Sequence, residues 1–443
     1  MRRKFSFKGE FFKNVVTLMT GTIAAQVFTV AVSPILTRIF TPADFGVLAV
    51  FTALNAVLAI IAAARYETAI MLPTDDNDAF NIVVLSSAIT LGVCGLLQGG
   101  IYFFATEIHE MAHTPLAGKW LHLLPLSVAL TTGTQIMIYW NNRGKKFRQL
   151  SITRAIHGFS TGASQCALGY GPGGSISLVA GHVLGHVLSL SALVKMNQES
   201  IKASGPFVSV AAIKENAKKY KRFPLFALWG ALFDSSASQV PLFVIASFFS
   251  ASITGLFGFT IKVLSLPLFL ISSAVSEVLY QKITQLDHAK PSSLRGYIVR
   301  IFLLLGGVTV PFCLLFTLYG VEIFSFVFGK DWQMAGEFAG PLSIAAGVRF
   351  MVSPLSVVLN LNHNVTKGVG WQITYFLTLT AVLLSCAGQS IGFLLWAFVS
   401  HEVVLFGIYF AVIIWASKHP HSDSFSLPLR DVDTAVAAKA AGK

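Results

Sequence analysis

Long apolar segments recur along the whole chain and constrain its fold more than any other feature. A helix needs about 20 mostly apolar residues to cross roughly 30 Å of hydrocarbon. Inside a bilayer every backbone polar group needs an internal partner, which a helix supplies. The pattern therefore predicts an all-α polytopic membrane protein with about twelve transmembrane helices. We expect them near residues 15–37, 44–64, 81–105, 121–140, 150–170, 175–194, 223–248, 253–279, 298–319, 338–360, 368–387 and 391–416.

The charged residues support a membrane environment. Only 12% of the 443 residues are charged, about half the share that a water-exposed surface needs. The net charge of +12 does not indicate nucleic acid, because the basic residues gather in particular loops beside apolar segments. Of 32 Lys and Arg residues, 26 fall in the segments on one side, 3 on the other and 3 within spans. This asymmetry predicts both termini in the cytoplasm, with a retained first span rather than a cleaved signal peptide.

The predicted spans divide into two halves. Residues 40–48 (FTPADFGVL) and 249–257 (FSASITGLF) share an aromatic residue, a polar turn and a glycine that lead into a helix. The same offset of about 209–210 brings Glu67 opposite Glu277, as in a parallel repeat. We therefore expect an N-terminal six-helix lobe, a basic cytoplasmic linker, a C-terminal six-helix lobe and a cytoplasmic tail, at residues 1–194, 195–222, 223–416 and 417–443.

Two histidine patterns raise the question of a metal site. Residues 109–113 spell H-E-x-x-H, the zinc-protease signature. Thr114-Pro115 follows at once, and no Asp or Glu occurs between Glu110 and Glu199 to supply a further ligand, so we interpret the motif as a short external loop. His182 and His186 lie four residues apart, but the adjacent glycines favour close helix packing there. We expect no metal and no cofactor.

Ionisable residues within spans are expensive in hydrocarbon and usually face a cavity or a partner. Four of them belong to the second half: Asp234, Lys262, Arg349 and Glu402. Two internal ion pairs are one interpretation. The other is a water-filled path in which Arg154, His157, Lys262 and Arg349 contact an anionic substrate and Asp234 and Glu402 exchange ions.

Prolines inside the predicted spans indicate bent or interrupted helices, which membrane proteins tolerate where a helix lines a cavity. They are Pro34, Pro241, Pro267, Pro311 and Pro354.

Five segments are similar to those of a known family: residues 38–50 (RIFTPADFGVLAV), 64–81, 140–148 (WNNRGKKFR), 220–249 and 255–282. They resemble the Wzx-type oligosaccharide flippases of the multidrug/oligosaccharidyl-lipid/polysaccharide exporter superfamily. The resemblance implies two lobes in a V around a central cavity. It implies no enzyme activity, but movement of undecaprenyl-diphosphate-linked sugar repeats across the bacterial inner membrane for O-antigen, lipopolysaccharide or capsule assembly. The implied partners are that lipid-linked oligosaccharide, membrane lipids and other polysaccharide assembly proteins.

Within the resembling stretches, Arg65, Glu67 and Glu277 are candidates for a gate. We interpret Arg65, Glu67 and the acidic run Asp75, Asp76 and Asp78 as a gate or an inter-lobe ion pair. The alternative is a solvated loop in which an Asp caps a helix. Two other functions stay open. A drug exporter of the same superfamily would share the fold, whereas a membrane polysaccharide polymerase or glycosyltransferase would need larger external or cytoplasmic segments than this chain has.

Overall fold

The computed structural model describes residues 3–104, 119–171, 173–286, 291–360 and 365–416. Within these residues the fold is helical throughout, with no strand. Twelve of the helices have 20 residues or more: α1 (Arg3–Ile39), α2 (Pro42–Ala62), α3 (Asp76–Phe103), α5 (Leu124–Arg143), α6 (Phe147–Gly169), α7 (Gly174–Met196), α10 (Leu228–Phe248), α11 (Ala251–Leu286), α12 (Pro291–Phe328), α13 (Gln333–Val352), α14 (Val365–Cys386) and α15 (Ile391–Ala416).

Each predicted span overlaps one of these helices. Ten helices in the described part of the chain are long and apolar enough to cross a membrane. The two others are α6, which is richer in polar residues, and α14, whose described apolar stretch is Gly370–Cys386. The chain is thus an all-helical polytopic membrane protein of about ten spans, and the expectation of twelve exceeds what length and composition establish.

Short elements connect these helices: η1 (Tyr66–Met71), η2 (Lys119–Leu123), α8 (Gln198–Ser204), η3 (Gly205–Phe207), α9 (Val210–Lys219), η4 (Phe223–Ala227), η5 (Lys330–Trp332) and η6 (Ser353–Asn360). The predicted linker is therefore partly helical. It also packs against the first half, because Asn81 of α3 donates to the Phe207 carbonyl (3.2 Å) and accepts from the Ser209 amide (3.1 Å).

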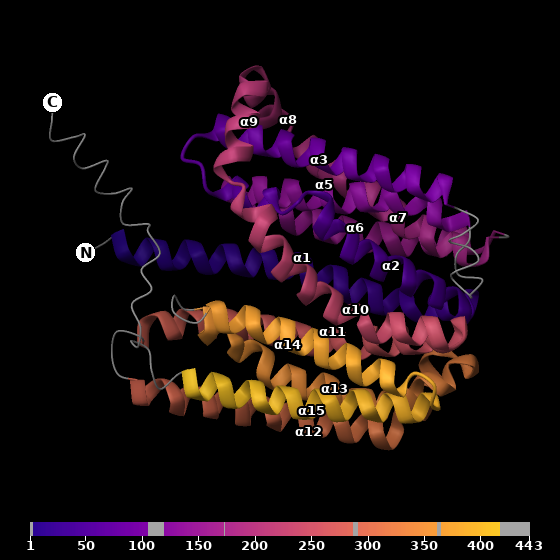
Figure 1. Cartoon of the computed structure of the whole chain (residues 1–443). Coiled ribbons are helices and arrows are strands. Elements are labelled where there is room, and N and C mark those ends of the chain that lie inside the picture. The colour runs from indigo at the N-terminus through magenta and orange to yellow at the C-terminus, as the bar shows by residue number, and fades with distance from the viewer. Residues whose placement is uncertain (1–2, 105–118, 172, 287–290, 361–364, 417–443) are drawn as a thin grey trace.

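The helices form two groups that follow the order of the chain. In Figure 1 the first-half helices lie on one side and α11 to α15 on the other, with α1 and α10 between them. Within the first half α6 packs between α1 and α7, and small residues allow the close approach. A methyl group at Gly158 would lie 2.9 Å from Cα of Ala25, and one at Gly181 would lie 2.9 Å from Cα of Gln165.

The two halves meet where α2 and α11 begin. A methyl group at Gly46 would overlap the Ala251 carbonyl oxygen, and one at Gly255 would overlap the Pro42 carbonyl oxygen. These residues are related by the offset of the sequence repeat, so the contact is reciprocal. The helix starts are also equivalent, since the hydroxyl of Thr41 caps α2 and that of Ser250 accepts from the Ile253 amide (3.3 Å) at the start of α11. We call this the α2–α11 contact.

A buried aromatic cluster reinforces the same end of the molecule. Trp332 is fully buried and its indole donates to the Thr37 carbonyl of α1 (3.1 Å). Its ring centroid lies 4.9 Å from that of Phe45 and 4.5 Å from that of Phe259. Since Phe45 and Thr37 belong to the first half, Trp332 joins the halves both by packing and by a hydrogen bond.

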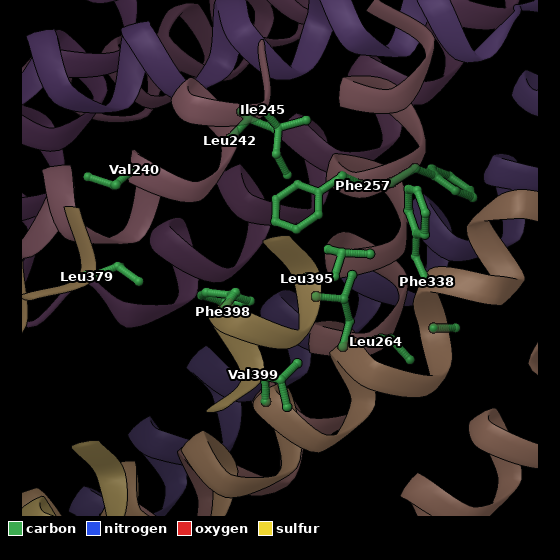
Figure 2. Close-up of a cluster of buried hydrophobic side chains, with 14 of the residues drawn as sticks. Val240, Leu242, Ile245, Phe257, Leu264, Phe338, Leu379, Leu395, Phe398 and Val399 are labelled. Carbon is green, nitrogen blue, oxygen red and sulfur yellow. The ribbon is translucent and has the colours of Figure 1, made fainter. Parts of the chain in front are cut away.

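Apolar side chains fill the interior of the second half. Figure 2 shows them converging from several helices, including Ile245 of α10, Phe257 and Leu264 of α11, and Leu395 and Phe398 of α15. Residues of this kind contribute about 1.5–3 kcal/mol each when they leave water. In a bilayer, packing replaces part of that driving force, so close contact rather than dehydration holds these helices together.

Candidate functional site

A cavity of about 420 Å³ lies between the two halves, directly beside the α2–α11 contact. The first half contributes residues of α1, α2, α6 and α7, and the second half contributes residues of α10 and α11. Polar side chains are spread around its otherwise apolar wall: Thr29, Thr52, Thr161, Gln165, His182, Ser238, Gln239 and Lys262. A cavity at an interface between repeats, with a few polar groups on an apolar wall, is the usual form of a transporter binding site.

Lys262 is the cation of this central cavity. It lies in the middle of the apolar part of α11, and its side chain is exposed to the cavity. No carboxylate of a described residue lies within 4.0 Å of it to form a salt bridge. An ammonium group at this depth is tolerated only in contact with water or an anion.

A second cavity, of about 380 Å³, lies within the second half. It is bounded by α10, η6, α13, α14 and α15, and Asp234 and Arg349 both line it. Ser238 of α10 lines both this cavity and the central one, so the two cavities adjoin at α10. The structure therefore places Lys262 and Arg349 in two neighbouring cavities.

Arg349 forms one end of a polar triad. Its guanidinium lies 3.0 Å from Oε2 of Glu402 and donates to the hydroxyl of Tyr375 (2.6 Å), which in turn donates to the other Glu402 oxygen. Glu402 is completely buried, whereas 41% of the Arg349 side chain is exposed. Arg349 thus neutralises a buried carboxylate while part of its side chain stays accessible from the cavity.

The expectation of two internal ion pairs is therefore half right. Arg349 pairs with Glu402, but Asp234 and Lys262 line different cavities and neither forms a salt bridge with a described residue. Asp234 is exposed within the second-half cavity, one turn from Ser238 on the same helix.

The first-half candidates lie on α6. Arg154 donates to the hydroxyl of Thr22 on α1 (2.6 Å). His157 belongs to a cluster with His182 and His186 of α7, with ring centroids 4.3 Å apart for His157 and His186 and 4.8 Å apart for His182 and His186. His182 carries this cluster to the central cavity, whereas His157 is not part of the cavity wall.

The gate candidates Arg65 and Glu67 lie together near the opposite end of α2 from the α2–α11 contact. Arg65 has a left-handed backbone (φ 63°) and pairs with the buried Glu67 at 3.3 Å. Burial raises the pKa of the Glu67 carboxyl, and Arg65 offsets part of that rise. Tyr66, between them, donates to the Ala217 carbonyl of α9 (2.9 Å), which joins this loop to the linker.

Two sequence features lie partly or wholly outside the described residues. Glu277 lies within α11, and its side chain falls outside the described residues. The H-E-x-x-H at 109–113 also lies outside the described residues.

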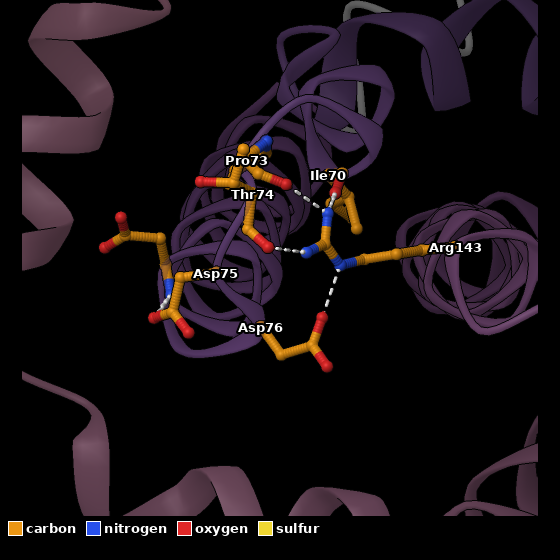
Figure 3. A network of polar contacts seen from close by, with 7 residues as sticks. Ile70, Pro73, Thr74, Asp75, Asp76 and Arg143 are labelled. Carbon is orange, nitrogen blue, oxygen red and sulfur yellow. Dashed lines mark hydrogen bonds and ion pairs between the residues drawn. The ribbon is translucent and has the colours of Figure 1, made fainter. Parts of the chain in front are cut away.

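Arg143 of α5 fixes the loop that follows the gate candidates. Figure 3 shows its guanidinium bound to the Asp76 carboxylate (2.8 Å) and to the Pro73 carbonyl (2.6 Å), with further bonds to Ile70 and Thr74. Asp75 caps the start of α3 by accepting from the Asp78 amide (3.3 Å). The acidic run therefore caps a helix and pairs within the first half, which agrees with the interpretation as a capped loop.

Several cavity residues escaped the sequence analysis. Tyr375, Trp371 and Gln372 lie on α14, and Gln239 lies on α10. Uncharged polar and aromatic residues are common in membrane helices, so their types carry no signal. Their spacing from Asp234 and Arg349 was available only once the helices were packed.

Comparisons with known proteins agree with this architecture. The family model described as "Polysaccharide biosynthesis protein" matches residues 35–337. The succinoglycan biosynthesis transport protein ExoT of Rhizobium meliloti (strain 1021) is 22% identical over 414 residues, which cover 90% of this chain and 79% of ExoT.

Two solved structures are similar in fold. The lipid II flippase MurJ in an inward closed conformation has a TM-score of 0.65 at 16% identity, covering 92% of this chain and 88% of MurJ. An inward-facing multidrug resistance MATE family transporter of the MOP superfamily has a TM-score of 0.61 at 12% identity, covering 92% of this chain and 96% of the transporter. The chain therefore has a MATE/MurJ-like fold.

Proposed function

Because the chain belongs to the polysaccharide biosynthesis protein family, we propose that it flips undecaprenyl-diphosphate-linked oligosaccharide repeat units across the bacterial inner membrane. The chain is a multi-pass membrane transporter for polysaccharide biosynthesis, of a superfamily that transports rather than catalyses. The proposed substrates are the lipid-linked repeat units of O-antigen, lipopolysaccharide or capsule. The names of ExoT and of the lipid II flippase MurJ support this substrate class.

The proposed arrangement has twelve spans in two lobes. The N-terminal lobe comprises residues 1–194, the linker 195–222, the C-terminal lobe 223–416 and the cytoplasmic tail 417–443. α6 and α14 complete each set of six, since their 23 and 22 residues give helices of about 33–35 Å. Contact with α1 and α7 shields α6 from lipid and accounts for its polar residues. The linker's lysines then lie beside anionic lipid headgroups.

The observation that carries the proposal is Lys262, an accessible cation that forms no salt bridge with a described residue and lies in a mid-membrane cavity between the halves. A lipid-linked diphosphate is an anion that must cross at this depth with its glycan hydrated. Lys262 and the exposed part of Arg349 would attract the diphosphate, while the lipid tail stays in the bilayer. Arg154 and His157, which lie outside the cavity wall, extend the polar path within the first half.

Alternating access would open and close the α2–α11 contact. With both termini in the cytoplasm, this contact would lie on the outer side, where the starts of α2 and α11 touch. Arg65, Glu67 and Glu277 would form the gate at the inner side. Asp234 and Glu402 would bind and release the coupling ion. Glu402 would do so when Arg349 turns to the substrate, because the carboxylate then loses its counter-charge.

A deletion strain tests the proposal. The strain is expected to accumulate lipid-linked repeat units on the cytoplasmic leaflet and to lose surface polysaccharide, and the wild-type gene is expected to restore both. Lys262→Ala should insert normally but fail to restore export, whereas Lys202→Ala, which removes an exposed linker cation, should restore it. Normal export in the deletion strain, with altered drug sensitivity instead, would point to a drug exporter and refute the proposal. Glycan joining by the purified protein would indicate a polymerase or glycosyltransferase.

A further inference from the structure

The second-half cavity has a carboxylate and tryptophan and tyrosine rings in its wall, none of which line the central cavity. Aromatic rings occupy one side of it, contributed by Trp371, Tyr375, Phe406 and Tyr409. Its remaining wall carries side chains that donate or accept hydrogen bonds, namely Asp234, Ser238, Ser353, Ser356 and Gln372. A volume of about 380 Å³ lies within the range of small-molecule sites.

The aromatic side is ordered by stacking. The rings of Trp371 and Tyr409 lie 4.3 Å apart and within 10° of parallel, and those of Trp371 and Tyr375 lie 6.5 Å apart at 29°. Tyr375 is fixed in turn by its bonds to Arg349 and Glu402. Three rings from α14 and α15 are thereby held as a rigid wall at little conformational cost to a ligand.

The polar side, in contrast, has unused hydrogen-bonding capacity. No described residue forms a salt bridge or a side-chain hydrogen bond with the Asp234 carboxylate, and the Gln372 amide likewise has no hydrogen-bond partner among the described side chains. Polar groups that line a membrane cavity without protein partners remain available to a hydrated ligand.

We propose that this cavity is a glycosyl subsite that binds the sugar proximal to the diphosphate. A pyranose has an apolar face of C–H groups, which suits an aromatic wall, and hydroxyls around its rim, which suit a carboxylate and an amide. Arg349 lines this cavity beside the rings, since its guanidinium lies 5.9 Å from the Tyr375 ring centroid and 5.6 Å from that of Phe406. A diphosphate held by the cations would leave its first sugar beside these rings.

The proposal rests on the proposed function, and one pair of ligands separates the two. The purified protein in nanodiscs is titrated with a polyprenyl diphosphate that carries one hexose and with the same lipid diphosphate without sugar. The wild type is expected to bind the glycosylated lipid roughly tenfold more tightly, the effect of one or two net hydrogen bonds. Equal affinities would overturn the glycosyl subsite alone, whereas no binding of either lipid would overturn the proposed function too.

Variants locate the preference. Asp234→Asn and Gln372→Ala should each remove most of it, and Gln372→Ala should leave the affinity for the bare lipid diphosphate within about twofold. Trp371→Ala should remove it also, and Trp371→Phe should retain part of it. The matched control is Trp396→Ala, because Trp396 is 55% exposed on α15 and lines neither cavity. A preference that survives all three cavity variants would place the sugar elsewhere and contradict the proposal.

Discussion

Removing Arg349 separates its structural role from its proposed role in transport. Arg349→Ala would leave the Glu402 carboxylate fully buried without its counter-charge. Removing one partner of a buried pair costs about 3–5 kcal/mol. Since 41% of the Arg349 side chain is exposed, water softens the loss, and we expect the lower end, about 3 kcal/mol.

The double variant Arg349→Ala/Glu402→Gln should recover much of this loss, because a neutral amide needs no counter-charge. The free energy of unfolding is measured by denaturant titration in detergent for the wild type, both single variants and the double variant. A coupling energy above about 1 kcal/mol is expected. A double variant no more stable than Arg349→Ala would refute the reasoning about the pair.

Transport by the same four proteins completes the test. If Arg349 only balances Glu402, the double variant regains stability and transports as fast as Glu402→Gln. If Arg349 also contacts the substrate, stability returns and transport stays below that of Glu402→Gln, which is the result we expect. Equal transport by the double variant and Glu402→Gln would remove Arg349 from the substrate path.

Three further predictions concern other parts of the fold. Gly255→Val should strain the α2–α11 contact, lower the free energy of unfolding by about 1–3 kcal/mol and reduce transport. Gly99→Val is the control, because a Cβ at Gly99 meets nothing within 4 Å, and it should have smaller effects on stability and transport. Equal effects of the two variants would contradict the contact's role. Arg143→Lys should cost about 1–2 kcal/mol, since lysine cannot bond Asp76 and the loop carbonyls together, and should speed hydrogen exchange in residues 71–75; unchanged exchange would refute it. The raised pKa of Glu67 gives a stability contribution that is present below the unfolded pKa and lost as pH rises through the folded pKa. The thermal stability of Glu67→Gln should therefore rise relative to that of the wild type as pH rises. A difference in melting temperature between the two proteins that stays constant with pH would contradict this prediction.

The positions of the helices were predictable because the hydrocarbon thickness imposes a length that composition reveals. The ends were less so. α11 continues to Leu286 and α12 runs from Pro291 to Phe328, beyond the apolar stretches, because helical hydrogen bonds persist past the interface. Pro354 was predicted within a span but lies in η6, just after α13 ends at Val352, since proline cannot continue the backbone hydrogen bonds there.

The candidate residues were predictable as a set, and their partners were not. Charged residues are rare within membrane spans, so residue type alone identified Lys262, Arg349, Asp234 and Glu402. Which of them pair depends on how α13 and α15 rotate against each other, and nothing in residue type encodes that rotation. Tyr375, the third member of the triad, looks like any aromatic residue in a membrane helix.

The repeat shows how a weak pattern gains meaning from packing. The nine-residue likeness of 40–48 and 249–257 is slight as sequence. In the fold its two glycines face the equivalent helix start of the other half, Gly46 against Ala251 and Gly255 against Pro42. Small residues were needed there because the backbones touch, so the pattern reflects the contact between the halves.

Reconstituted flipping tests the central claim most directly. Purified protein is placed in vesicles whose inner leaflet carries a polyprenyl-diphosphate-linked oligosaccharide, and a glycosidase added outside reports each glycan that reaches the outer leaflet. We predict that the wild type exposes the glycan, that Lys262→Ala exposes it at least about tenfold more slowly, and that Lys202→Ala matches the wild type. Exposure no faster than in protein-free vesicles, or equal rates for Lys262→Ala and the wild type, would contradict the account.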